Sequence, residues 1–185
     1  MLYITKGEVR KDTKDGFKVT HMGRTVLLDA KTAEVWKNGR YNFCRARMAE
    51  DIRAVCYMAN VGIAELEQEE TEIAKLRILS RCLITVKKKS FETFLSPIER
   101  RILCWLRYPG FRIGIAELVA LEENRGLLNK EIFLDKNWKD LAARIYGARP
   151  LANMSLEKRM EHSKSRNETV AALMHLVKRK RVRLY

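Results

Sequence analysis

The chain has 185 residues, enough for one ordinary domain or two small ones, and 46% of them are hydrophobic, which excludes a chain that is disordered throughout. No apolar run approaches the roughly 20 residues that span a bilayer, and the N-terminus lacks a signal-peptide pattern, so we expect a cytoplasmic protein, nucleoid-associated or, in a eukaryote, nuclear. The net charge of +14, from 37 Lys and Arg against 23 Asp and Glu, favours a polyanionic partner and no membrane.

The first thirty residues have the composition of short antiparallel strands. β-Branched and aromatic residues fill three segments, and Asp15-Gly16 and Met22-Gly23 are typical of the hairpin turns between them. The expected strands are Leu2–Val9, Phe17–His21 and Thr25–Leu28.

Helices are expected after these strands. Asp29 has the side chain of a helix N-cap, and Gly39 has the freedom to end a helix in a left-handed conformation. Gly62 ends or bends the second helix. The expected elements, in chain order, are helices over Ala30–Asn38, Arg45–Met58 and Leu66–Arg81 and an alternating strand over Leu83–Lys87.

The second half is expected to begin after a basic linker over Lys87–Phe91. Ser96-Pro97-Ile98-Glu99 and Ser165-Arg166-Asn167-Glu168 both have the pattern of a capping box at a helix start. The expected elements are helices over Pro97–Arg107, Ile115–Glu123, Lys136–Tyr146 (capped by Asp135), Ser155–His162 and Ser165–Arg179, with strands at Glu131–Leu134 and Lys180–Tyr185.

The two halves end alike. Residues 73–79 align with residues 170–176, at an offset of 97 residues, and in each half an amphipathic helix leads through a basic turn into a short strand. The pattern predicts an α+β fold that is mostly α, with two tandem domains over residues 1–89 and 90–185.

This order of elements resembles the winged helix-turn-helix DNA-binding proteins. The resemblance implies two winged-helix-like modules with small antiparallel sheets, in which a third helix enters the DNA major groove and a wing touches the backbone. The segment Val26–Trp36 is also faintly similar to PqqD-type peptide-binding winged helices. The chain departs from the pattern at Lys180–Tyr185, which has no return strand. Its partner is either absent, or supplied by Glu131–Leu134 or another chain.

The last helix is the leading candidate for DNA contact. If Val170, Leu173, Met174 and Val177 face the core, the opposite face presents side chains to base edges, and flanking cations hold phosphates. The candidate nucleic-acid-binding residues are Lys164, Ser165, Arg166, Glu168, Ala172, His175, Lys178, Arg179, Lys180, Arg181 and Arg183.

Three other interpretations of this region stay open. The basic face can be merely solvated, or the run 178–183 can be a nuclear-targeting signal. Alternatively, Ile115–Glu123 and Lys136–Tyr146 form the helix-turn-helix pair.

The equivalent helix of the first half differs in charge. Five carboxylates crowd its expected start and would repel phosphates: Glu65, Glu67, Glu69, Glu70 and Glu72. The first half is therefore expected to bind a protein partner or a second copy of the chain.

Together these features predict a non-enzymatic DNA-binding protein, a transcriptional regulator that acts as a homodimer on duplex DNA. The alternatives are an adaptor that binds an acidic protein or peptide, and an RNA-binding accessory factor. No phosphate loop, catalytic motif or zinc-ligand spacing is present, so no cofactor or metal is expected. The four cysteines are expected to be buried and unreactive, with redox or metal sensing as the alternative.

Overall fold

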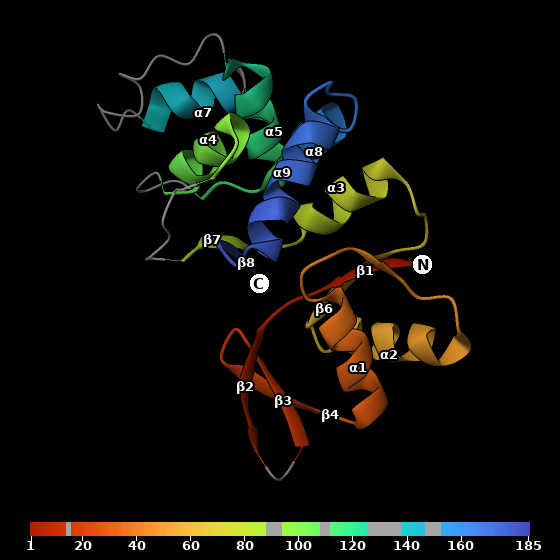
Figure 1. Cartoon of the computed structure of the whole chain (residues 1–185). Helices are drawn as coiled ribbons and strands as arrows, with labels where there is room; N and C mark the ends of the chain where they lie inside the picture. The colour runs from red at the N-terminus through yellow and green to blue at the C-terminus, as the bar shows by residue number, and fades with distance from the viewer. Residues whose placement is uncertain (14–15, 88–93, 108–111, 126–137, 147–152) are drawn as a thin grey trace. The chain divides into compact units, whose positions relative to one another are not determined.

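A computed structural model describes residues 1–13, 16–87, 94–107, 112–125, 138–146 and 153–185 (Figure 1). The fold is α+β, with helices predominating over small antiparallel sheets, as the sequence predicts. Residue contacts divide the chain into two compact units. Unit 1 contains Met1–Thr85 and Arg183–Tyr185, and unit 2 contains Val86–Val182. The last three residues, which the sequence assigns to the second half, thus belong with the first.

Unit 1 contains two three-stranded sheets, one with the order β5-β1-β6 and one with the order β2-β3-β4. Their strands are β1 (Leu2–Thr5), β2 (Glu8–Thr13), β3 (Gly16–His21), β4 (Arg24–Leu28), β5 (Cys44–Arg45) and β6 (Ala64–Glu67). The single strand expected over Leu2–Val9 is broken at Gly7, whose φ of 93° is one that glycine adopts readily. The break sends β1 and β2 into different sheets.

Helix α1 (Ala30–Gly39) begins where the sequence predicts, because Oδ1 of Asp29 accepts a hydrogen bond from the Thr32 amide at 2.9 Å. Gly39 has a different role from the expected one. It is the last helical residue, and a Cβ there would lie 2.5 Å from Cε2 of Tyr3. Glycine is needed at this position for the close approach of α1 to β1.

The helix expected over Leu66–Arg81 is wrong in its first part. Residues 64–67 form β6, which pairs antiparallel with β1 from Leu2↔Glu67 to Thr5↔Ala64. The alternation Ala64-Glu65-Leu66-Glu67 has the period of a strand, and the chain becomes helical only in α3 (Glu72–Ser80), after a cap by Thr71. Similarly, Arg45 lies in β5, and helix α2 covers Ala49–Asn60.

The core of unit 1 lies between its helices and sheets. Trp36 is its largest fully buried side chain; its ring lies 5.6 Å from that of Phe17, and its Nε1 donates to the Lys6 carbonyl at 3.0 Å. Val55, Met58 and other apolar side chains complete this cluster.

Unit 2 is a group of helices: α4 (Pro97–Leu106), α5 (Ile115–Glu123), α7 (Trp138–Tyr146), α8 (Asn153–Met160) and α9 (Arg166–Lys178). Helix α5 packs against α4, α7, α8 and α9, and its buried side chains include Leu118 and Leu121. The capping box at Ser96 and Glu99 is confirmed. The Glu99 amide donates to Oγ of Ser96 at 3.3 Å, and the Ser96 amide donates to Oε2 of Glu99 at 2.6 Å.

Other expected helix starts differ. Ser165 has a helical conformation and its side chain makes no cap bond, and Ser155 lies inside α8. The expected linker residues 88–91, strand Glu131–Leu134 and cap Asp135 lie outside the described residues.

The terminal strand has a partner that the sequence analysis did not consider. Strand β8 (Val182–Leu184) pairs with β7 (Ile84–Val86), and Leu83 and Tyr185 exchange backbone hydrogen bonds of 2.6 Å and 2.8 Å. The strand that ends the predicted first half therefore pairs with the strand that ends the predicted second half. Among the described residues, no helix has both the length and the apolar composition to cross a membrane.

Candidate nucleic-acid interface

The side chains expected to hold phosphates lie at the two ends of α9. Lys164, before the helix, and Lys178, its last residue, are exposed, and neither has an ion-pair partner within the described ranges. Lys180 follows with a φ of 57°, which turns the chain from α9 toward β8, and Arg181 is half-buried. Of these cations, Lys164 and Lys178 are available to an external anion.

Arg166 and its neighbours are engaged locally. The Arg166 guanidinium donates to the Glu161 carbonyl and, at 2.9 Å, to Oδ1 of Asn167. The Ser165 amide donates to Oγ of Ser163 at 3.2 Å, whereas Glu168 is exposed in the first turn of α9. Arg166 therefore fixes the entrance of the helix in addition to carrying positive charge there.

The middle of α9 differs from the expected reading face. Ala172, expected to face bases, is buried at 8% exposed, and Met174, expected in the core, is half-buried. The helix packs against both α4 and α5, so its buried side covers more of the circumference than one narrow stripe. Its buried residues are Thr169, Val170, Ala172, Leu173, Leu176 and Val177.

His175 is exposed, but its ring is already held. Its Nδ1 lies 2.6 Å from Oε1 of Glu99, the capping residue of α4. Burial acts to raise the pKa of the Glu99 carboxyl, but hydrogen bonds from Ser96 and from His175 outweigh it, and the net pKa is lowered. His175 would have to release this carboxylate to free Nδ1 for a base.

Arg179, the second expected base reader, also has an internal partner. Its Nη1 donates to the carbonyl of Phe94 at 2.8 Å, and Phe94 is itself 89% exposed with a φ of 64°. Arg179 is exposed, so its remaining donors can meet a phosphate. A bidentate contact to guanine would compete with the bond to Phe94.

Arg183, the last of the candidates, does not belong to the same unit. It lies in β8 within unit 1, where Nη1 makes an ion pair with Oε1 of Glu8, and the Tyr185 hydroxyl donates to the same oxygen. The structure therefore groups ten of the eleven candidates in unit 2 and separates Arg183 from them.

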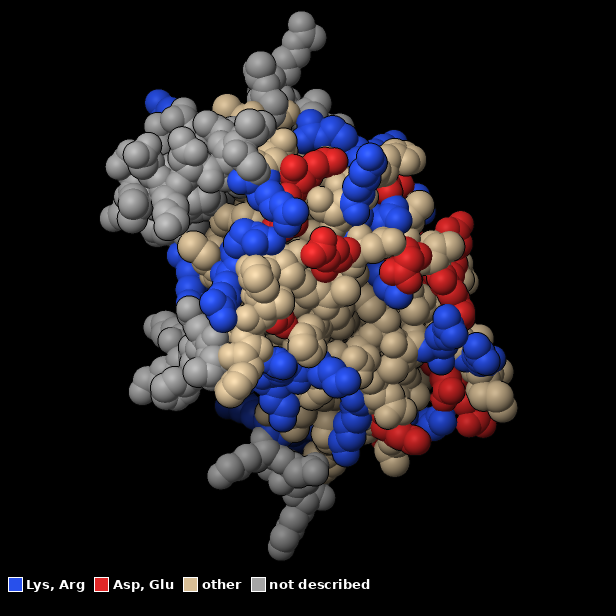
Figure 2. Space-filling view, turned by 45° about the horizontal axis from the view of Figure 1, so that its top comes forward, with Lys and Arg blue, Asp and Glu red and all other residues tan. Residues whose placement is uncertain are grey.

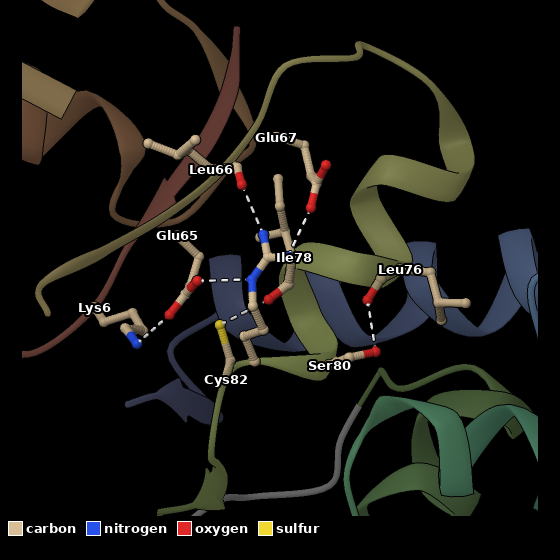
Figure 3. Close-up of polar contacts among 9 residues, drawn as sticks. Lys6, Glu65, Leu66, Glu67, Leu76, Ile78, Ser80 and Cys82 are labelled. Carbon is tan, nitrogen blue, oxygen red and sulfur yellow. Dashed lines mark hydrogen bonds and ion pairs between the residues drawn. The ribbon is translucent and has the colours of Figure 1, made fainter. Parts of the chain in front are cut away.

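Two acids of the cluster in unit 1, Glu65 and Glu67, are neutralised by neighbouring cations (Figure 3). Arg81 donates to Glu65 at 2.9 Å, to Glu67 at 2.6 Å and to the Leu66 carbonyl at 2.7 Å, and Lys6 pairs with Glu65 at 2.7 Å. Both carboxylates belong to β6, so they do not open a helix as expected. Their role is to attach the end of α3 to the sheet.

Two of the three remaining acids of this cluster, Glu70 and Glu72, are also paired. Glu70 accepts from the N-terminal ammonium at 3.3 Å and pairs with Arg45 at 2.8 Å, and Glu72 pairs with Lys75. Repulsion of phosphates by this cluster is therefore weaker than the sequence indicates.

Unit 2 keeps three of its carboxylates inside: Glu99, Glu117 and Glu122 are 2%, 8% and 2% exposed. Glu122 pairs with Arg101 and with Arg125, and Glu117 accepts from the Gly114 amide at 2.9 Å and the Tyr146 hydroxyl at 2.8 Å. These negative charges stabilise the helix group and contribute little to its outer surface.

The four cysteine thiols differ in burial. Cys82 is buried, its Sγ donates to the Ile78 carbonyl at 3.4 Å, and burial raises its pKa to about 12. Cys44 and Cys56 are half-buried and Cys104 is exposed, so the expectation of four buried thiols is wrong. In the described part of the chain, no group of three or more His, Cys, Asp or Glu side chains is arranged to hold a metal ion.

No protein-family model matches the sequence, and no curated protein or solved structure resembles it significantly.

Proposed function

We propose that the protein binds the phosphate backbone of nucleic acid, duplex DNA in the first instance, through unit 2. The observation that carries this proposal is the distribution of charge between the units. Residues 86–182 contain 21 Lys and Arg against 11 Asp and Glu, whereas residues 1–85 and 183–185 contain 16 against 12. The excess of Lys and Arg over Asp and Glu is therefore ten in unit 2 (21 minus 11) and four in unit 1 (16 minus 12), and a field of this sign attracts polyanions.

The arrangement of α9 supports contacts to phosphate more than to bases. Lys164 and Lys178 are exposed and unpaired among the described residues, whereas His175 is held by Glu99 and Ala172 is buried. Figure 2 shows Lys and Arg side chains in several groups, with acidic and uncharged side chains between them. Separate groups can meet successive phosphates along a backbone.

A regulatory role and a dimer are also part of the proposal. The sequence predicts a dimer because the terminal strand lacks a return partner and because the acidic third helix of the first half is unfit for DNA. Strand β7 now supplies the partner, and Arg81 neutralises Glu65 and Glu67. A regulator must also prefer particular DNA sequences. To contact bases, His175 would have to leave Glu99, and Arg179 would have to leave the Phe94 carbonyl.

The test is binding across a salt series to duplex DNA, single-stranded DNA, duplex RNA and an acidic peptide. We expect log affinity for duplex DNA to fall linearly with log salt, and Lys164→Ala and Lys178→Ala each to reduce the slope by about one. Lys31→Ala removes the same charge from unit 1, where Lys31 pairs with Asp51 at 2.9 Å, and should leave the slope unchanged.

Three results would contradict the proposal. The first is no salt-dependent binding to any nucleic acid. The second is an equal reduction of the salt slope in Lys164→Ala, Lys178→Ala and Lys31→Ala. That result would show that binding depends only on the net charge of the protein. Tighter binding to the acidic peptide than to DNA would instead favour the adaptor.

A further inference from the structure

Unit 1 contains a cation whose surroundings are unusual. Arg40, the residue after α1, is 8% exposed, and its guanidinium lies 5.4 Å from the ring of Trp36 and 5.4 Å from the ring of Tyr41. The described residues provide its guanidinium with no hydrogen bond and no ion pair. A guanidinium removed from water without a counter-charge is costly, so such groups are generally paired.

A neighbouring carboxylate, that of Glu8, does not serve as that counter-charge. Glu8 attracts Arg40 electrostatically but lies outside ion-pair distance, and its Oε1 already accepts from Arg183 and from the Tyr185 hydroxyl. Arg183 adds a second positive charge near Arg40. The cluster of Arg40, Arg183 and Glu8 thus carries one positive charge in excess. Burial accordingly lowers the pKa of Arg40.

The donors of Arg40 are largely buried but not fully enclosed. Nδ1 of His21 is the one fully enclosed side-chain nitrogen or oxygen in the described residues without a partner. The unpartnered nitrogens of Arg40 therefore keep contact with solvent. Aromatic rings hold the plane of a guanidinium while leaving its N–H edge free, and that edge matches the two oxygens of a carboxylate or phosphate.

We propose that Arg40, held by Trp36 and Tyr41 and assisted by the charge of Arg183, forms a binding site in unit 1 for a small oxyanion of the carboxylate or phosphate class. This site is independent of the nucleic-acid surface proposed for unit 2. Its occupant supplies the counter-charge that Arg40 lacks.

The experiment measures the thermal midpoint of the full chain while sodium phosphate, or in a second arm sodium acetate, replaces sodium chloride at constant ionic strength. We expect a saturable rise of about 4 °C or more with at least one oxyanion. The arm that saturates at the lower concentration identifies phosphate or carboxylate as the preferred group. Because a basic protein binds phosphate non-specifically, the control is Lys37→Met, which removes one charge from the same end of α1, where Lys37 lies over the Phe17 ring.

Arg40→Met should abolish the rise, whereas Lys37→Met should keep it. In chloride, Arg40→Met should be as stable as the parent or more stable, because an unpaired buried charge is replaced by an apolar side chain of similar length. A purely structural arginine would instead destabilise the chain when lost and would show no oxyanion dependence. Should Arg40→Met fail to fold, Arg40→Lys tests the same site, with an expected loss of affinity of at least about tenfold because the planar fork is lost.

An unchanged rise in the Arg40 variants, or no saturable rise in the parent, would overturn this site. Arg40→Met should also retain the salt dependence of DNA binding. A failure of the oxyanion site would therefore leave DNA binding intact, whereas a failure of the nucleic-acid proposal would leave the oxyanion effect intact.

Discussion

Nδ1 of His175 lies 2.6 Å from Oε1 of Glu99, and this contact joins the last helix of unit 2 to the first turn of α4. The other oxygen of the same carboxylate accepts from the Ser96 amide at 2.6 Å. One buried side chain is therefore both a helix cap and a link between two helices.

Glu99→Gln should destabilise unit 2 by about 1 to 3 kcal/mol, because the charge-assisted bonds to Ser96 and His175 are weakened. The lowered pKa of Glu99 also predicts a pH dependence. Its contribution is fully present above its unfolded pKa, near 4.5, and is lost as the pH falls through the lower folded value. Urea unfolding at pH 7, 5, 4 and 3 should show a steeper acid loss for the parent than for Glu99→Gln. Parallel curves would show that Glu99 is not the group responsible.

Two neighbouring alanines test the orientation of α9. Ala172 is buried and Ala171 is exposed, although they differ by one position. Ala172→Asp should cost about 2 to 4 kcal/mol, since it places an unpaired carboxylate in the packed side of the helix. Ala171→Asp should cost less than about 1 kcal/mol. Equal effects in denaturant titrations would mean that the helix is oriented differently.

Arg81→Ala should destabilise unit 1 by about 1 to 2 kcal/mol, because Glu65 and Glu67 lose their shared donor while partly buried. The Lys75–Glu72 pair is a matched comparison on the same helix, with side chains that are 30% and 50% exposed. Lys75→Ala should cost less than about 0.5 kcal/mol, as exposed pairs do. Arg81→Lys should recover only part of the loss, since the ammonium group cannot reach both carboxylates and the Leu66 carbonyl together. Full recovery would show that charge alone matters.

His21 should make stability depend on pH near neutrality. Burial is the main cause of its lowered pKa, with a further contribution from Lys6, and its Nδ1 has no partner. Below its unfolded pKa of about 6.5 the unfolded chain binds the proton first, so stability should fall as the pH drops from 7 toward 5. His21→Phe should flatten this part of the profile and retain the ring contact with Tyr185. A profile that stays as steep in the variant would assign the effect to another group.

Local sequence signals correctly predicted the starts of two helices and one hairpin turn. Asp29 and Ser96 begin α1 and α4 as expected, because capping depends on residues within one helical turn. The hairpin turn at Met22-Gly23, with φ values of 48° and 82°, is equally local. In contrast, β6 was mistaken for helix because its strand character depends on pairing with β1, about sixty residues earlier.

The candidate site was predicted less well for the same reason. The orientation of α9 depends on two neighbouring helices at once, and the partner of His175 lies 76 residues away. Arg40 was missed altogether. Its only local signal is the spacing of Trp36 and Tyr41 around it, which does not reveal burial.

The assignment of Arg183–Tyr185 to unit 1 has a consequence for biosynthesis. The ribosome delivers β8 only after the whole of unit 2, so the backbone pairing of Leu83 with Tyr185 and the Glu8–Arg183 ion pair cannot form while the nascent chain still ends within unit 2. Until then, β7 presents an unpaired edge to other strands in the cell, where it is open to incorrect pairing.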